Sequence, residues 1–421
     1  MSMGVVDTMA VGRVSAAAIG AVSLGTMIFY TIGIFASALL LGLDTLVSQA
    51  FGAGDLDDCR HSLINGVWLA LFLIVPVMVT VEACNPLLAA IGIDPAVVAD
   101  TRPYLRALNW SAPSLLLFFG FRRYLQSVNL VRPVMITLIT ANLVNLAGNW
   151  IFVFGNLGAP KLGAEGAGWA TCISRVFMMA VLGAVIWRHD PGISHAAWVP
   201  DFRRIRKLLV LGFPAAGQIG LETAVFATVT VLIGRLSATA LAGHQIALTT
   251  ISMTFMMPLG ISSAAAVRVG QAIGRKDVKS AARSGWTALA LGGTAMSMAA
   301  LTLLFAPRFI ARLFTPDVEI IAAGVILLRV AAFFQLVDGF QVVITGALRG
   351  AGDTRTPMLC HFAGYWVIGL PLGAWLCFRA GLGAPGLWIG LSVGLILIGI
   401  VLVAFWRRTV VKMRLSPPWP G

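Results

Sequence analysis

Two carboxylates stand inside long apolar stretches of the chain, where an acid is expensive. Glu222 lies in the middle of Leu211–Gly234, and Asp338 lies in the run VAAFFQLVDGFQVVITGALRG. About 20 apolar residues cross a bilayer, and a carboxylate at that depth costs roughly 2.5–3.5 kcal/mol on insertion scales. Such acids normally face a bundle interior or a wet cavity and mark an ion or substrate path. The alternative interpretation is a neutral Glu222 that bonds to a neighbouring helix.

A second polar group lies in the first half of the chain. Asp7 stands near the start, and Asn145 and Asn149 are four residues apart in TANLVNLAGNWIFVFG, so they share a helix face. The oxygens of one Asp and two Asn suit a proton or a small cation such as sodium. Asn side chains also commonly form hydrogen bonds between membrane helices, so both interpretations stay open.

The composition is that of a membrane protein. Of the 421 residues, 58% are hydrophobic and 11% are charged, whereas a soluble domain has roughly 25% charged residues. The net charge is +13, but the basic residues fall in short loops, where they set membrane topology. We therefore expect an all-α integral membrane protein with no nucleic-acid partner.

Signals of catalysis are absent from the sequence. The five His residues are scattered without HExxH, the five Cys residues form no CxxC, and there is no Walker loop. We expect no catalytic residue, no enzyme activity and no cofactor. His244 is interpreted as a packing or hydrogen-bonding residue. Asp44, near the end of its apolar span, is interpreted as a structural residue that can reach water.

Apolar runs predict eleven membrane spans, at 16–47, 62–83, 105–127, 133–155, 164–187, 207–234, 240–268, 284–306, 320–348, 357–378 and 384–406. The fragment Met1–Ala10 would be a twelfth, but it is too short to cross alone. With that fragment counted as the first, loops after even-numbered spans and the C-terminus hold 20 Lys and Arg, and the opposite side holds 8, among them Arg13. The positive-inside rule places the first side, with the C-terminus, in the cytoplasm.

The chain repeats itself at an offset of 222 residues. GRVSAAAIGA at Gly12 matches GRLSATALAG at Gly234, and QAFGAGD at Gln49 matches QAIGRKD at Gln271. Half a chain is then six helices, so the halves should be parallel repeats. We predict an N-terminal lobe at 1–187, a basic cytoplasmic linker at 188–206 and a C-terminal lobe at 207–421. The same offset places the start of the counterpart of the 207–234 span about fifteen residues before Met1, so the first helix is expected to be truncated.

Several stretches together resemble the multidrug and toxic compound extrusion family, called MATE, and its NorM-like bacterial branch most. They are VDTMAVGRVSAAAIGAV from Val6, LVSQAFGAGD from Leu46, LGFPAAGQIGLET from Leu211, AGHQIA from Ala242 and QLVDGFQVVITGALRGAGDTRTPM from Gln335. The likeness covers nearly the whole chain. It implies twelve helices in two six-helix lobes, and export of cationic or amphipathic compounds in antiport with sodium or protons by alternating access.

The resemblance also implies roles for single residues. Cation coupling and drug transport fall to Glu222 and Asp338, and a first-lobe site falls to Asp7 with the matching positions Asn145, Asn149 and Thr171. A sodium ion is therefore expected at Glu222 and Asp338, or at Asp7, Asn145 and Asn149. Two positions depart from the family pattern, since some members have an aspartate at Asn149 and a tyrosine at Phe334.

The expected partners are small organic cations, amphipathic drugs and the lipid bilayer, and we expect a monomer in the bacterial inner (plasma) membrane. The alternative is a flippase for a lipid-linked precursor, which would favour a basic cavity for a pyrophosphate. Arg175 and Arg329 are the only basic residues that lie more than five residues inside a predicted span, so this alternative has little support. A membrane-embedded enzyme lacks a nucleophile or metal constellation.

Overall fold

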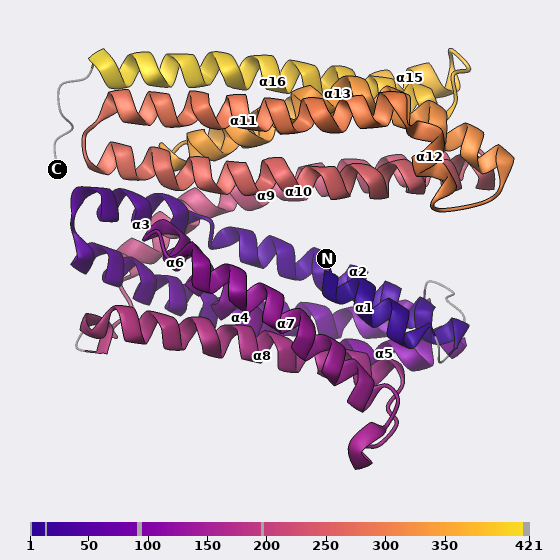
Figure 1. Cartoon of the computed structure of the whole chain (residues 1–421), viewed down its shortest axis with the longest axis horizontal. Coiled ribbons are helices and arrows are strands. Elements are labelled where there is room, and N and C mark those ends of the chain that lie inside the picture. The colour runs from indigo at the N-terminus through magenta and orange to yellow at the C-terminus, as the bar shows by residue number, and fades with distance from the viewer. Residues whose placement is uncertain (1, 13–14, 91–94, 195–197, 416–421) are drawn as a thin grey trace. The chain divides into compact units, whose positions relative to one another are not determined.

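The computed structural model describes residues 2–12, 15–90, 95–194 and 198–415, and every regular element among them is a helix (Figure 1). Arg13, residues 195–197 of the expected linker and the last six residues lie outside the described part. The first helices are α1 (Ser2–Val11), α2 (Ala16–Leu39), α3 (Gly42–Ala53), α4 (Leu56–Ala90), α5 (Pro95–Asn109), α6 (Ala112–Ser127), α7 (Val131–Phe152) and α8 (Ala164–His189), with short turns η1 (Asn156–Gly158) and η2 (Pro191–Ser194). The others are α9 (Phe202–Gly234), α10 (Ala238–Gly274), α11 (Val278–Phe305), α12 (Pro307–Arg312), α13 (Val318–Gly350), α14 (Arg355–His361), η3 (Phe362–Gly369), α15 (Leu370–Phe378) and α16 (Ala384–Leu415).

Ten stretches of the described chain are long and apolar enough to cross a membrane, and each overlaps one of the eleven predicted spans. The remaining predicted span, 105–127, is not one continuous helix. Helix α5 ends at Asn109, and α6 begins at Ala112 with a proline in its first turn. Because Pro113 has no amide hydrogen and its ring crowds the preceding turn, it starts a helix more readily than it continues one.

The internal repeat is visible at the starts of two helices. Ser15 caps α2, where its hydroxyl accepts from the amide of Ala18 at 3.0 Å, and Ser237 caps α10 in the same way through Ala240. The two caps are 222 residues apart, and their backbone angles agree, with φ of −163° and −164°. A serine cap satisfies an amide that the first helical turn leaves without a partner. The offset found in the sequence is therefore also an offset in local structure.

The turns that follow α3 and α10 repeat as well. Gly54 has a φ of +81°, and Lys276, 222 residues later, has a φ of +59°. The amide of Asp55 bonds to the carbonyl of Ala50 at 3.0 Å, and Asp277 bonds to its counterpart at 2.9 Å. Helices commonly end with a residue in the left-handed conformation, followed by an amide that donates to a carbonyl five residues earlier. Glycine adopts it freely, whereas Lys276 adopts a conformation that few side chains favour.

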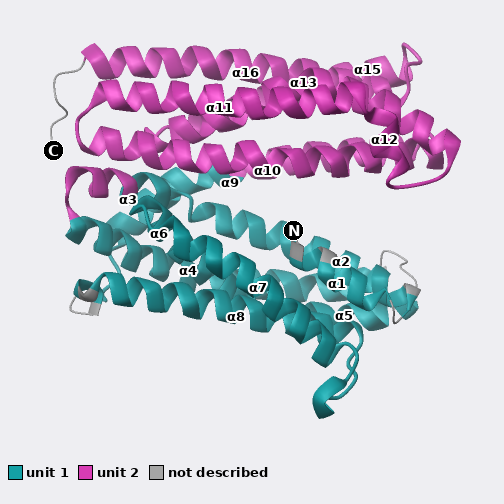
Figure 2. Cartoon of the chain, viewed as in Figure 1, with its two compact units in different colours: residues 1–47, 56–216 teal, residues 48–55, 217–421 magenta. Residues whose placement is uncertain are grey.

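The described chain divides into two compact units (Figure 2). Unit 1 comprises residues 1–47 and 56–216, and unit 2 comprises residues 48–55 and 217–421. In unit 1, α8 packs against α5, α6 and α7, and α2 packs against α5. In unit 2, α13 lies at the centre and packs against α10, α11 and α16. The lobe boundaries predicted above follow the repeat rather than these contacts, and they stay a prediction.

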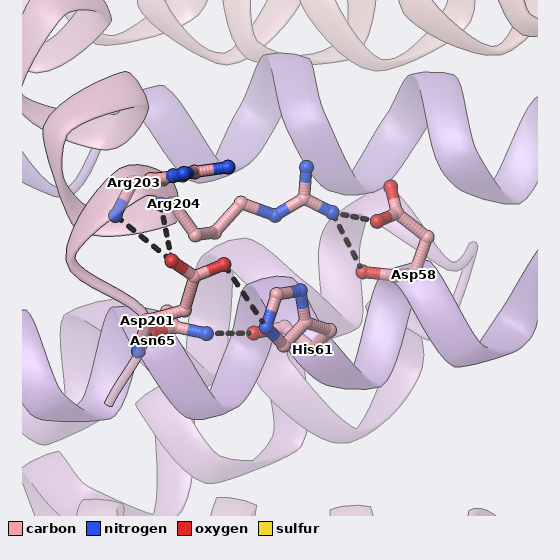
Figure 3. A network of polar contacts seen from close by, with 6 residues as sticks. All are labelled: Asp58, His61, Asn65, Asp201, Arg203 and Arg204. Atoms are coloured by element: carbon pink, nitrogen blue, oxygen red, sulfur yellow. Dashed lines mark hydrogen bonds and ion pairs between the residues drawn. The ribbon is translucent and has the colours of Figure 1, made fainter. Parts of the chain in front are cut away.

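A network of polar contacts among six residues holds the beginning of α9 against α4 within unit 1 (Figure 3): Asp58, His61, Asn65, Asp201, Arg203 and Arg204. The carboxylate of Asp201 accepts from the amides of Arg203 at 2.8 Å and Arg204 at 3.3 Å, so it caps α9. The amide of Asp201 in turn donates to Asn65 Oδ1 at 2.7 Å. Arg204 pairs with Asp58, and His61 Nε2 lies 3.5 Å from Asp201 Oδ2. The predicted basic linker is thus tied to α4 at its end.

Candidate functional site

The structure brings the four polar residues predicted in the first half of the chain into one buried cluster. Asp7 lies on α1, Asn145 and Asn149 lie on α7, and Thr171 lies on α8. Asp7 Oδ1 accepts from Asn149 Nδ2 at 2.7 Å and from Asn145 Nδ2 at 3.1 Å. Its other oxygen accepts from the Thr171 hydroxyl at 2.7 Å. All four side chains are buried, so three helices converge on one carboxylate.

Two oxygens of this cluster remain available to a ligand. Asn145 Oδ1 and Asn149 Oδ1 are buried, and within the described residues they have no hydrogen-bond partner. Buried polar atoms are normally satisfied. Carboxylate and amide oxygens are ligands that small hard cations accept, and a proton on Asp7 could be donated to an amide oxygen. The donor set therefore fits either sodium or a proton.

Arg175 is a basic residue whose charge acts on this cluster, and the sequence did not connect the two. It lies one turn after Thr171 on α8, donates to Ser111 Oγ at 2.6 Å and stands 4.7 Å above the ring of Phe29. Its charge also interacts with that of Asp7. An arginine held by a hydroxyl and an aromatic face can stay charged in an apolar setting, so it partly balances Asp7.

The two acids of the apolar stretches both lie in unit 2. Asp338 on α13 is 5% exposed, and its Oδ1 accepts from Gln341 Nε2 at 3.1 Å. Glu222 on α9 is half-buried, and a negative charge on Asp338 disfavours a second negative charge on Glu222. Arg329, the one basic residue of the 320–348 span, is exposed. A monovalent cation or a proton would relieve the repulsion between the two acids.

A small cavity with aromatic walls lies beside these acids. Phe226 follows Glu222 by one helical turn, and Phe334 precedes Asp338 by one turn. Both line the cavity, together with Tyr365, Trp388, Leu391, Ser392 and Leu395. Aromatic faces attract cations, so the surroundings of the acid pair favour positive charge.

A chain of hydrogen bonds fixes one wall of that cavity. Trp388 Nε1 donates to His244 Nδ1 at 3.1 Å, which leaves His244 Nε2 as the donor to the Thr230 hydroxyl at 2.9 Å. Thr230 donates to the carbonyl of Phe226 at 2.9 Å. Each member of the chain has a partner, so His244 acts through hydrogen bonding, as the sequence predicted.

The structure corrects one interpretation of an intramembrane acid. Asp44 was expected to reach water, but it is fully buried and pairs with Arg123 at 3.3 Å. The pair compensates a charge that would otherwise be costly in an apolar setting. The structural role predicted for Asp44 fits this arrangement, whereas the contact with water does not.

The sequence resembles transporters over almost its full length. The sequence model of the MatE family matches residues 1–151 and 214–375. The probable multidrug resistance protein NorM of Brucella suis biovar 1 (strain 1330) is 32% identical over 96% of this chain and 88% of its own length. Its namesake in Bradyrhizobium diazoefficiens is 36% identical over 97% and 89%. The multidrug resistance protein MdtK of Yersinia pseudotuberculosis is 34% identical over 96% and 90%.

The fold is shared with solved structures. A crystal structure of MATE in the bent conformation aligns with a TM-score of 0.88 at 18% identity, over 98% of this chain and 92% of that one. The eukaryotic MATE transporter AtDTX14 aligns with a TM-score of 0.87 at 21% identity, over 98% and 93%. The all-α membrane architecture expected from the sequence is therefore confirmed, and the twelve-helix count is consistent with this fold.

Proposed function

Since the chain belongs to the MatE family, we propose that it is a secondary active transporter that exports cationic and amphipathic compounds. Inward flow of sodium or protons drives this export by alternating access. Multidrug resistance proteins are among its relatives, and drugs of that kind are the proposed substrates. We also propose that the protein is a monomer and that it lies in the bacterial inner membrane.

The acid pair of unit 2 is the observation that carries the proposal. Glu222 and Asp338 each lie one helical turn from a phenylalanine that lines a small cavity with aromatic walls, and a charge on Asp338 disfavours a charge on Glu222. Such a site binds a cation more tightly than it binds a neutral ligand. An organic cation and a coupling ion that need the same carboxylates exclude each other, and this exclusion is what antiport requires.

Coupling then follows from differential affinity. A ligand shifts a conformational equilibrium only by the difference between its affinities for the two states. The membrane potential adds about 2.3 kcal/mol for each elementary charge that moves through 100 mV. The cluster of Asp7, Asn145, Asn149 and Thr171 is proposed as a second ion site, which takes sodium or a proton in unit 1.

Efflux in living cells tests this function. Cells without their own efflux pumps would express the chain and be loaded with ethidium, a permanently charged aromatic cation. We expect export of ethidium to continue when ATP synthesis is blocked, and to stop when an ionophore collapses the sodium or the proton gradient. Export that survives the collapse of both gradients would exclude ion antiport.

The proposed topology places the start of α9 in the cytoplasm, because the basic loops share that side. Arg203 is exposed there, and exposed Lys161 lies on the opposite side of the expected topology. We expect a cysteine in Arg203→Cys to resist an impermeant thiol reagent in intact cells, and a cysteine in Lys161→Cys to react with it. Unaltered protein would measure the labelling of the five native cysteines. Reaction at position 203 with protection at position 161 would invert the topology.

A further inference from the structure

A π-helical segment interrupts the helix that contains Tyr365. In η3 (Phe362–Gly369), between α14 and α15, hydrogen bonds from residue i+5 replace the usual i+4 bonds. The wider turn adds a residue, so its side chains point in other directions than in an uninterrupted α-helix. Helix α16 approaches this segment closely, since a Cβ added at Gly394 would overlap the carbonyl oxygen of Gly364. Such turns occur frequently at functional sites.

The π-helical segment packs against the part of α9 that carries Glu222. Trp366 Nε1 donates to the carbonyl of Leu221, the residue before Glu222, at 3.1 Å. The rings of Tyr365 and Phe226 meet edge to face, with centroids 6.2 Å apart. These two contacts, at Leu221 and Phe226, flank Glu222 on α9, so Tyr365 packs next to the turn that carries Glu222.

The same tyrosine faces the surroundings of Asp338. Tyr365 lines the small cavity together with Phe334, which lies one turn before Asp338 on α13. The charges of Glu222 and Asp338 both act on the Tyr365 hydroxyl. One phenol from a third element thus lines the cavity whose other walls, at Phe226 and Phe334, lie one turn from the two acids.

The hydroxyl of Tyr365 adds nothing to the stability of the packed helices. The side chain is 1% exposed, and within the described residues its oxygen has no hydrogen-bond partner. A buried hydroxyl without a partner destabilises a protein, and phenylalanine would fill the same space without that penalty. The other three tyrosines, Tyr30, Tyr104 and Tyr124, belong to unit 1, so this is the one phenol of unit 2.

We infer that Tyr365 is the third member of the ion site of Glu222 and Asp338. Its oxygen binds a cation held by the two carboxylates, and its O–H donates to a carboxylate that carries no proton. The inference rests on the proposed function, and it deepens it by naming a neutral ligand for the coupling ion.

The other titratable groups around Tyr365 already have partners. The ring of His361 lies 5.8 Å from that of Tyr365, and its two nitrogens contact the carbonyl of Pro357 at 2.7 Å and Gln218 Nε2 at 3.4 Å. His244 is held by Trp388 and Thr230. Glu222 and Asp338 are thus the groups to which the hydroxyl can respond.

Competition between ethidium and ions tests the inference on the purified full chain. Bound ethidium would be titrated with sodium chloride at constant ionic strength and, separately, with acid. We expect Tyr365→Phe to weaken the competing ion about tenfold, as the loss of one hydrogen bond to a charged group does. The thermal stability of Tyr365→Phe should equal or exceed that of the unaltered protein, because the substitution removes a buried hydroxyl that has no partner. The matched control is Tyr124→Phe, which loses a bond to Asp190 and should leave ion competition unchanged.

The outcomes separate this inference from the proposed function. Ion competition in Tyr365→Phe within twofold of the unaltered protein would overturn the role of Tyr365, whatever its stability. If Glu222→Gln and Asp338→Asn also compete normally, the proposed ion site itself fails. A second measurement keeps the hydroxyl in place: the ¹⁹F resonance of 3-fluorotyrosine at position 365 should shift when sodium or acid is added. No shift with either would count against the inference.

Discussion

Glu222→Gln and Asp338→Asn should each abolish ion-coupled export while the protein still folds and inserts. Both changes keep shape and hydrogen-bonding capacity but remove a charge. A charge at contact distance from a monovalent cation contributes roughly 4 kcal/mol at an effective dielectric constant of 20. A factor of ten in affinity is about 1.4 kcal/mol, so each variant should lose two to three orders of magnitude in ion affinity. Ethidium-triggered ion release from the purified protein measures this loss.

The control for these variants is another acid on the same helix as Asp338. Glu319 is exposed in the first turn of α13, and Glu319→Gln removes the same charge far from the acid pair in sequence. We expect normal efflux and ion release in that variant. Normal efflux and unchanged ion coupling in both Glu222→Gln and Asp338→Asn would remove these residues from the coupling site and leave Asp7 with its partners as the candidate.

Asp7→Asn should disrupt the cluster of unit 1. Asp7 accepts three hydrogen bonds, from Asn145, Asn149 and Thr171. An amide in its place turns one of the two acceptor oxygens into a donor, so at least one of these three donors loses its acceptor. A buried donor that loses its acceptor costs about 1–3 kcal/mol, so the loss of stability should be of that size or larger. Thermal unfolding of the purified protein measures it.

The response of Asp7→Asn to ions distinguishes an ion site from a purely structural cluster. A ligand at 100 times its dissociation constant stabilises a protein by about 2.7 kcal/mol. Sodium or acid should stabilise the unaltered protein, and the variant should lose that response. Asn149→Asp, which adds a second carboxylate, should strengthen it. An unchanged response in both variants would mean that the cluster only joins α1, α7 and α8.

Some of this site could be read from the sequence because charge in an apolar run is conspicuous. Glu222 and Asp338 were found in that way, and the four-residue spacing of Asn145 and Asn149 predicted their common face. Residue types alone grouped those amides with Asp7, whereas Thr171 came from the resemblance to the MATE family. The cluster needed three helices to meet, which no local pattern encodes. The placement of each residue is now observed, whereas its role in coupling stays a proposal.

Other features were missed because they depend on tertiary packing. The run 357–378 has the composition of an ordinary span, yet it contains η3, where α16 approaches at Gly364 and Gly394. Tyr365 therefore gave no signal as a site residue. The ion pair of Asp44 with Arg123 joins residues 79 positions apart, so the burial of Asp44 could not be predicted either. The break in the 105–127 span did have a local sign, Pro113, which the apolar pattern concealed.

Transport by the purified chain in proteoliposomes is the most direct measurement of ion-driven drug export. Vesicles without ATP would hold ethidium, and either a sodium gradient or a pH gradient of equal driving force would be imposed. We expect one of these gradients to move ethidium against its own concentration gradient, and an ethidium gradient to move that same ion in return. Ethidium that follows only its own gradient under both conditions would contradict secondary active antiport.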